Sequence, residues 1–462
     1  MKIKNHIKFL NIVLISMILW QITLPVSAFG WHIKRDTGNV FNAQEKLNYV
    51  NINWWDNFSD PLLKSYVLMA VQSNHDLKQT SWKVEEYRQT VKTVFSRELP
   101  SLSVSGYYDL IHFPNVGNLN VKNNIFAVPF QASYEADVFQ KNHDKTKSSK
   151  KTYEASKFDE KSIYISLVTD VSTVYINIMK FDKQILLQRQ LVCVKLEELK
   201  REIEKYNRGT VSATDLNDSK KAYENAKSSL DDLAKSRDKS LDQLAVLVGE
   251  SPDNISNFKR ESIDKFEYIQ PVPASIASDV IFSRPDVQSI ETQLEKAKID
   301  VRVARKEFLP TFNITGLYSL SNVGLGSFGS WESTLAALIA GASLDLFKGG
   351  FKVANLRVYK SKYEQMFESY KQVDLNAVKE VNDSLVIVRE DTKIDNNTVK
   401  NLNTQTDNYN RAKNRYKNGV ISCPKLLSEK ETMIESQQSQ VNSKANRLVD
   451  YLTLYKAVGG KL

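Results

Sequence analysis

Two hydrophobic periods alternate along the chain. Within 150–206, apolar residues are spaced alternately by four and three positions, which predicts one long helix with a heptad-like seam. The seam contains Tyr164, Val168, Val171, Tyr175 and Ile178, and resumes at Ile185, Val192, Leu196, Leu199, Ile203 and Tyr206. At 1.5 Å per residue this segment would extend roughly 85 Å. A soluble coiled-coil rod explains this part of the pattern equally well.

Four other segments alternate with a period of two. They begin at Leu102, Phe126, Phe312 and Leu338, and the last is expected to continue to Leu346. Each has about ten residues with one apolar and one polar face, as in tilted strands that cross a bilayer. The smallest membrane barrels have about eight strands. Because open sheet edges cannot lie in lipid, the pattern predicts either a soluble sheet or a barrel pooled from several chains.

The chain repeats itself at an offset of 210 residues. Residues 98–106 resemble 308–316, and Tyr206 and Gly209 correspond to Tyr416 and Gly419. Gly209 is the only glycine within 150–248 and Gly419 the only one within 351–458, so each predicts the turn of a helical hairpin. We expect a first repeat over 60–250 with a β-hairpin at 101–139, a linker over 251–280, and a second repeat over 281–462 with a β-hairpin at 311–347.

The first 28 residues are typical of a signal peptide. Lys2, Lys4 and Lys8 precede a mostly apolar run, and small residues end at Ala28. A retained membrane anchor is the alternative. Cleavage would remove three lysines and lower the formal net charge from +9 to 9 − 3 = +6. The mature chain would begin with an extended segment over 29–59. Because there is no cysteine near the cleavage site, a lipid anchor is not predicted there.

Composition and charge narrow the function classes. Hydrophobic residues make up 42% and charged residues 25%, with a mean hydropathy of -0.39, which excludes a polytopic helical membrane protein and a disordered chain. Two cysteines exclude a disulfide scaffold. We expect Cys193 to be a small core residue and Cys423 to be an exposed thiol. The basic residues are spread out, and the lysine-rich stretch 141–151 is expected between strand and helix, so no nucleic-acid binding is predicted.

Catalytic motifs are weak in this chain. Residues 324–329 fit the dinucleotide pattern GxGxxG, but the alternating residues that follow predict a strand where a helix is required. We interpret the glycines as a loop between strands. None of the five histidines forms an i, i+4 pair, and His143 is expected in a solvated loop. The sequence therefore predicts no enzyme, no cofactor and no metal site.

Several motifs, taken in order, resemble the TolC-type outer-membrane efflux proteins that serve resistance-nodulation-division pumps. They are Trp54–Leu62, Asn74–Leu77, Ser283–Val287, Phe308–Pro310 and Leu454–Gly460. The resemblance covers about residue 50 to the end. It implies a mixed α and β fold: a homotrimer with a twelve-stranded outer-membrane β-barrel, four strands per chain, continued by a long α-helical periplasmic tunnel. It also implies a periplasmic adaptor protein and an inner-membrane pump as partners.

The resemblance also implies two sets of site residues. The hairpin tips, expected to contact the adaptor, are Arg208, Gly209, Thr210, Val211 and Ser212 in the first repeat and Lys417, Asn418, Gly419, Val420, Ile421 and Ser422 in the second. The family commonly closes its tunnel with carboxylates just after the second turn. Here those positions are Lys425 and Ser428, with Asp215 and Asp218 as first-repeat counterparts. An acidic constriction is therefore not supported. Lys425 would add positive charge there, unless Glu429, Asp215 or Asp218 neutralises it. The alternative is that Lys425 points to solvent and does not face the constriction.

The sequence favours a passive outer-membrane exit duct of a tripartite efflux system that conducts small molecules, either drugs or metal ions. A type I protein-secretion duct is the alternative within the same class. A non-channel coiled-coil envelope rod is the alternative from another class.

Overall fold

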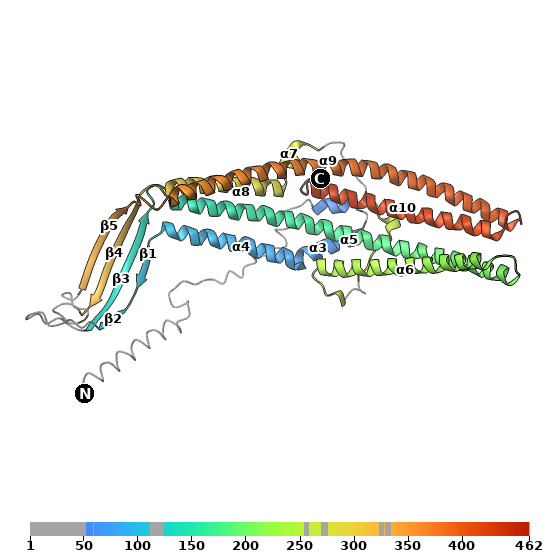
Figure 1. The fold of residues 1–462 in the computed structure, drawn as a ribbon, viewed down its shortest axis with the longest axis horizontal. Coiled ribbons are helices and arrows are strands. Elements are labelled where there is room, and N and C mark those ends of the chain that lie inside the picture. The colour runs from blue at the N-terminus through green and yellow to red at the C-terminus, as the bar shows by residue number, and fades with distance from the viewer. Residues whose placement is uncertain are drawn as a thin grey trace, which may run out of the picture. The chain divides into compact units, whose positions relative to one another are not determined.

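The computed structural model describes residues 52–58, 60–110, 124–253, 258–268, 276–322, 328 and 334–461. All of them belong to one compact unit, Ala43–Leu462. Within it, a β-sheet lies at one end of a set of long helices, and the connecting turns of two helical hairpins lie at the other end (Figure 1). The expected signal peptide, most of the segment 29–59 and most of the glycine motif lie outside the described residues.

The sheet is antiparallel and joins the two repeats. Its described strands are β1 (Ser101–Val104), β2 (Tyr107–Leu110), β3 (Asn124–Ala136), β4 (Thr311–Ser321) and β5 (Thr334–Ser343). β1 and β2 both pair with β3, β3 pairs with β4, and β4 pairs with β5. The sheet therefore has four positions across, with β1 and β2 on one edge and β5 on the other.

β1 and β2 are one predicted strand that is interrupted at Ser105 and Gly106. The register is continuous, because Val104 lies opposite Phe130 and Tyr107 opposite Ala127. The Ser105 N–H donates to the Pro129 carbonyl at 3.1 Å. Proline has no N–H to return, so one bond of the ladder is missing.

The last strand ends earlier than predicted. β5 stops at Ser343, and Leu346 lies beyond it with 90% of its surface exposed. The chain instead turns toward the next helix through Gly349 and Gly350, which have φ angles of 56° and 81°. These left-handed conformations suit glycine, and they end the extended backbone that the alternating residues suggested.

The two faces of the sheet differ in polarity. One face carries cross-strand neighbours such as Val104, Phe130 and Tyr318, with Leu102, Tyr134, Ile314 and Leu338 on the same side. The opposite face carries Ser103 and Gln131 in register and Glu135 opposite Asn313, although Leu335 and Ile339 of β5 on that side are apolar. Leu102 is 77% and Leu338 79% exposed, so no other described part of the chain covers the apolar face.

The helices repeat in matched pairs. They are α3 (Pro61–Ser73), α4 (His75–Phe95), α5 (Lys141–Asn207), α6 (Ala213–Leu247), α7 (Ser278–Phe282), α8 (Pro285–Lys306), α9 (Phe351–Lys417) and α10 (Cys423–Ala457). α5 and α9 each have 67 residues, and α6 and α10 each have 35. α5 packs against α6, and α9 against α10, which gives the two predicted helical hairpins.

The seam predicted in the first long helix forms the core of the helical part. Tyr164, Val168, Val171, Tyr175 and Ile178 are all at most 1% exposed. One described helix, α5, contains a stretch that is long and apolar enough to cross a membrane, but 67% of that stretch is buried inside the protein. We therefore interpret this stretch of α5 as part of a core helix. Toward the turn the seam is uncovered, with Ile203 at 42% and Tyr206 at 44% exposure.

An aromatic cluster joins segments that are far apart in the sequence. Trp54 stacks on Tyr455 with ring centroids 4.1 Å apart, and Phe58 stacks on Phe266 at 5.4 Å. Tyr268 stacks on Tyr451 at 4.3 Å. The cluster therefore joins three parts of the chain, which are the segment before α3, the linker and α10, in the middle of the helical part.

Gly249, just after α6, allows a close approach to α3. Its φ is 76°, and a Cβ there would lie 2.7 Å from the Ser73 carbonyl oxygen.

We predict that Gly249→Ala lowers the free energy of unfolding by about 2–4 kcal/mol, from backbone strain plus overpacking. Gly209→Ala is the matched control, because Gly209 has a similar φ of 71° but open space around it; it should cost only about 1 kcal/mol. Denaturant unfolding measures both, and equal losses would contradict the close-approach explanation.

Candidate functional site: helix–sheet junction and hairpin tips

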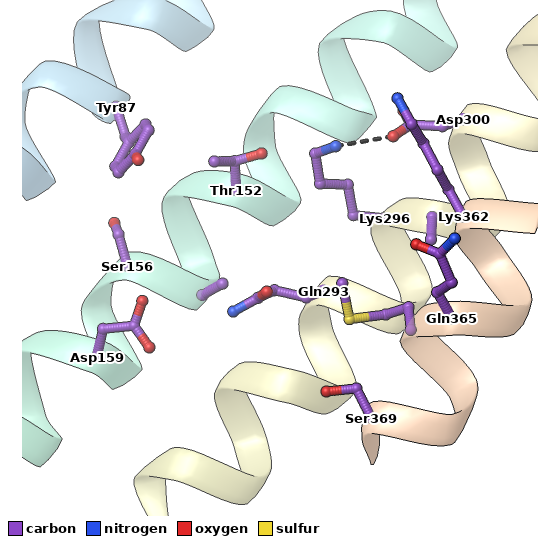
Figure 2. A pocket seen from close by; sticks show the side chains of 13 residues that line it. Tyr87, Thr152, Ser156, Asp159, Gln293, Lys296, Asp300, Lys362, Gln365 and Ser369 are labelled. Atoms are coloured by element: carbon purple, nitrogen blue, oxygen red, sulfur yellow. Dashed lines mark hydrogen bonds and ion pairs between the residues drawn. The ribbon is translucent and has the colours of Figure 1, made fainter. Parts of the chain in front are cut away.

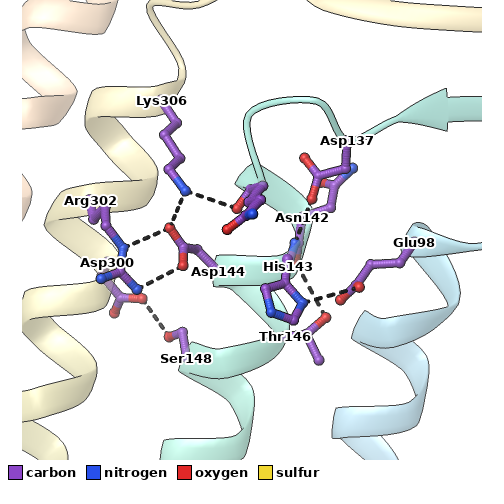
Figure 3. Close-up of polar contacts among 11 residues, drawn as sticks. Glu98, Asp137, Asn142, His143, Asp144, Thr146, Ser148, Asp300, Arg302 and Lys306 are labelled. Carbon is purple, nitrogen blue, oxygen red and sulfur yellow. Dashed lines mark hydrogen bonds and ion pairs between the residues drawn. The ribbon is translucent and has the colours of Figure 1, made fainter.

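The passage from sheet to helix is held by a buried carboxylate. The side chain of Asp144, in the first turn of α5, is only 3% exposed. Arg302 donates two hydrogen bonds to it, both at 2.7 Å, and Lys306 donates one at 2.6 Å (Figure 3). Burial raises the pKa of Asp144, but the bonds from Arg302 and Lys306 outweigh it and lower the pKa below its usual value. The ionised carboxylate therefore fixes α8 to the start of α5.

His143 lies in this junction rather than in a solvated loop, so that expectation was wrong. Its backbone N–H donates to Asp137 at 2.8 Å, and its ring Nδ1 lies 3.3 Å from Glu98 (Figure 3). The physical reason is Gln140, whose φ of 57° turns the chain from β3 into α5 within a few residues. The lysine-rich stretch 141–151 is consequently the first part of α5.

A groove of about 560 Å³ lies between α4, α5, α8 and α9 (Figure 2). Asp159 and Asp300 line it together with Lys296 and Lys362, and Lys296 donates to Asp300 at 2.7 Å. Charges of both signs are present, so the groove does not select an ion of one sign. Among the residues that the structure describes, no group of three or more His, Cys, Asp or Glu could hold a metal ion.

Arg284 connects three helices in the middle of the molecule. It is 6% exposed, and its guanidinium bonds Asp286 at 2.6 Å, Glu380 of α9 at 2.7 Å and the Ala457 carbonyl of α10 at 2.8 Å. A Cβ on Gly459 would lie 3.2 Å from the Arg284 Cα, so this position also needs glycine. The motifs Ser283–Val287 and Leu454–Gly460 are thus two sides of one structural contact.

The two hairpin turns have the same backbone conformation. Gly209 and Gly419 have φ angles of 71° and 75°, and the N–H of the following residue bonds back into the helix in each case. Thr210 donates to Lys205 at 3.0 Å, and Val420 donates to Arg415 at 2.8 Å. This is the Schellman end expected for a glycine just after a helix. Most of the predicted tip residues are exposed, and Val211 and Ile421 are half-buried.

Two of the four candidate constriction residues, Asp215 and Lys425, have local partners in a single chain. Asp215 forms a capping box with Ser212, in which each backbone N–H donates to the other side chain. The bonds from Ser212 lower the pKa of Asp215. Lys425 forms an ion pair with Glu429 at 2.6 Å. Asp218 and Ser428 are exposed.

Cys193 is exposed, which corrects the expectation of a core residue. The neighbouring Val194 is 1% exposed, and one residue on a helix turns the side chain by about 100° away from that packing face. Cys423, expected to be exposed, is half-buried.

A family model for the outer membrane efflux protein family matches residues 67–250 and 276–460. The chain belongs to the outer membrane efflux protein family. The two matched stretches are the two repeats, and together they cover most of the chain. Family membership places the protein in the outer membrane as an efflux channel, which agrees with an uncovered apolar face on a sheet of bilayer-spanning length.

Relatives of known name cover nearly the whole chain. The cation efflux system protein CusC of Escherichia coli is 24% identical over 433 residues, which is 89% of this chain and 90% of CusC. The toluene efflux pump outer membrane protein TtgC of Pseudomonas putida is 24% identical, over 88% of this chain and 84% of TtgC. The solved structure of the Campylobacter jejuni CmeC outer membrane channel superposes with a TM-score of 0.79 at 22% identity, over 89% of this chain and 88% of that one.

An acidic pair on α9 and α10 makes the helical part of this family member sensitive to pH. Burial, together with the nearby Asp391, raises the pKa of Asp450 to about 7. The buried Oδ2 of Asp450 has no hydrogen-bond partner within the described chain. The unfolded pKa is about 3.9, so the folded chain binds more protons between about pH 4 and 7. Stability therefore falls as pH rises through that window and is constant above it.

We predict that Asp450→Asn removes this fall and stabilises the protein at pH 8 by about 1–3 kcal/mol, after allowance for solvent screening. Thermal unfolding from pH 5 to 8 measures the effect. Asp383→Asn is the control, because Asp383 is an exposed carboxylate paired with Lys379 at 2.8 Å on the same helix, α9, as Asp391. If wild type and Asp450→Asn keep the same pH slope, the acidic pair is not the source.

Proposed function

We propose that three copies of this chain form a passive exit duct for small molecules. The observation that carries the proposal is the sheet: one apolar face, one polar face and two open edges. Unpaired backbone groups cost several kcal/mol each in lipid, so β1 and β5 must find partners. Further copies of the same sheet provide them, and three copies give a closed barrel of twelve strands, well above the minimum of about eight.

In this arrangement the long helices continue the barrel into the periplasm as a tunnel. The tips of both hairpins, Arg208–Ser212 and Lys417–Ser422, are then the parts farthest from the sheet (Figure 1). We assign them to contact with a periplasmic adaptor, which delivers cargo from an inner-membrane pump. The names of CusC and TtgC, which mention cations and toluene, support small-molecule cargo over protein secretion. The apolar sheet face argues against a coiled-coil rod.

The lipid-facing side is tested by two adjacent residues of β3. Phe130 and Gln131 point to opposite faces, and both are exposed in the single chain. We predict that Phe130→Arg costs about 2–4 kcal/mol of insertion free energy at the bilayer midplane and prevents assembly in the outer membrane. Gln131→Arg should insert normally and alter single-channel conductance in planar bilayers. Normal insertion of both variants, or of neither, would contradict the assignment of faces.

Lys425 and Glu429 set the charge at the proposed constriction. Because the two side chains are paired at 2.6 Å, Lys425 adds little net positive charge to the wild-type ring, and Asp215 and Asp218 should leave it weakly cation-selective. Lys425→Gln leaves the glutamates uncompensated and should shift the reversal potential toward cation preference, whereas Glu429→Gln should shift it toward anions. Both are measured in a salt gradient across a bilayer. An unchanged reversal potential in both variants would place the constriction elsewhere.

A further inference from the structure

The two hairpin tips share a backbone conformation but differ in charge. Residues 197–208 contain four basic and four acidic residues, whereas the equivalent residues 407–418 contain four basic residues and only Asp407 as an acid. The ascending arms do not differ in this way, because 213–221 and 423–431 each hold two bases and two acids. The asymmetry is therefore confined to the last turns of α9.

Two of the four basic residues of the first tip are paired within their own helix. Arg201 pairs with Glu197 at 3.1 Å, and Lys205 pairs with Glu202 at 2.5 Å. The cations at the end of α9 make no such pairs, although Asp407 precedes Arg411 by four residues as Glu197 precedes Arg201. They are Arg411, Lys413, Arg415 and Lys417, all exposed and without an ion pair to any residue that the structure describes. We call these four residues the basic tip.

The basic tip surrounds an apolar contact point. Ala412 is 7% exposed and faces the partner helix, so at about 100° per residue the arginines lie on one side of it and the lysines on the other. Tyr416 and Val420, at the end of the same helix and in the turn, are 40% and 61% exposed. An exposed tyrosine among arginines is the composition of an interface hot spot.

The charge has no explanation within the chain. Like charges four residues apart, as in Arg411 and Arg415 or Lys413 and Lys417, destabilise a helix. Cations near a helix C-terminus are favoured by the dipole, but α5 has the same length and the same kind of end, and it balances its charges. A partner rich in carboxylates would relieve the repulsion among the cations of α9. The end of α5, where basic and acidic residues are balanced, offers no equivalent positive surface.

We propose that the second hairpin, through the basic tip, carries the electrostatic part of adaptor docking, and that the adaptor presents an acidic surface around an apolar contact for Tyr416 and Val420. This rests on the proposed function, because it names the partner chemistry of the same tips. The first hairpin then contributes shape and apolar contact with little net charge. Docking driven by such a surface should weaken with salt, since the Debye length is about 8 Å at physiological ionic strength.

The test replaces all four cations of the basic tip in the full-length protein: Arg411→Gln, Lys413→Gln, Arg415→Gln and Lys417→Gln. The matched control exchanges the same residues at constant charge: Arg411→Lys, Lys413→Arg, Arg415→Lys and Lys417→Arg. The probe is the periplasmic adaptor that co-purifies with the wild-type protein, expressed alone. Its affinity for each detergent-solubilised variant is measured at low salt and again at about ten times that salt concentration, a range over which the Debye length falls about threefold.

We expect the neutral variant to bind the adaptor about tenfold or more weakly at low salt and to lose most of the salt dependence, while the exchange control stays close to wild type. All variants should retain the same native mass and conductance. Wild-type affinity and salt slope in the neutral variant would overturn the inference. So would a loss of trimers in that variant alone, because the cations would then serve contacts between copies.

Two further measurements separate this inference from the proposed function. Deletion of 418–421 should abolish adaptor binding and efflux while conductance persists. If the deletion abolishes binding but replacement of the four cations does not, the role of the basic tip is wrong and the assignment of the tips to adaptor contact still holds. Intact efflux after deletion, or no adaptor bound even at low salt, would overturn the assignment of the tips as well. Binding of the basic tip to phosphatidylglycerol vesicles, with adaptor affinity unaffected by the substitutions, would replace the protein partner with a lipid surface.

Discussion

The pairing of backbone groups at the sheet edges is the constraint on which the whole molecule depends. In hydrocarbon every N–H and C=O must be bonded within the protein, and water cannot substitute for a missing partner. The sheet of one chain has β1 and β2 on one edge and β5 on the other, with no described strand beyond either. It also has an apolar face that nothing in the described chain covers. Both features are liabilities in a soluble monomer and become necessary in a closed membrane barrel.

The same constraint accounts for the internal repeat. β3 and β4 come from different repeats and pair along ten residues, so each repeat supplies half of one sheet. Helices that leave this shared sheet must have equal lengths if both hairpins are to end at the same level, and α5 and α9 are equal in length, as are α6 and α10. Asp144 and Arg284 anchor the helices near the sheet and in the middle. The repeats are thus matched where they build the wall and differ in charge at the tips.

Much of this fold follows from patterns that a single chain displays. The change of hydrophobic period separates sheet from helix, and Gly209 and Gly419 are visible as turns because no other glycine interrupts the long helices. The glycine turns were predicted from the need for a left-handed conformation, and both have it. The resemblance to efflux proteins supplied the trimer and the partners, which periodicity alone could not give.

The features that sequence reasoning missed depend on contacts across elements. His143 joins the junction because Gln140 adopts an unusual conformation for a non-glycine residue. Cys193 is exposed because it lies one position off the packing face, a rotation that residue type does not reveal. The partner of Asp144 is 158 residues away, on α8. The unpaired cations of the basic tip could be counted in the sequence, but their lack of partners within the described chain required the structure.

The most direct test of the account is the native mass of the full-length protein extracted from outer membranes in detergent, with the detergent contribution subtracted. We predict a particle of three chains, each close to the 52.7 kDa of the 462 residues less any cleaved signal peptide. A monomer that stays in solution without detergent would contradict it, because a sheet with two open edges and an uncovered apolar face could not then be one third of a membrane barrel.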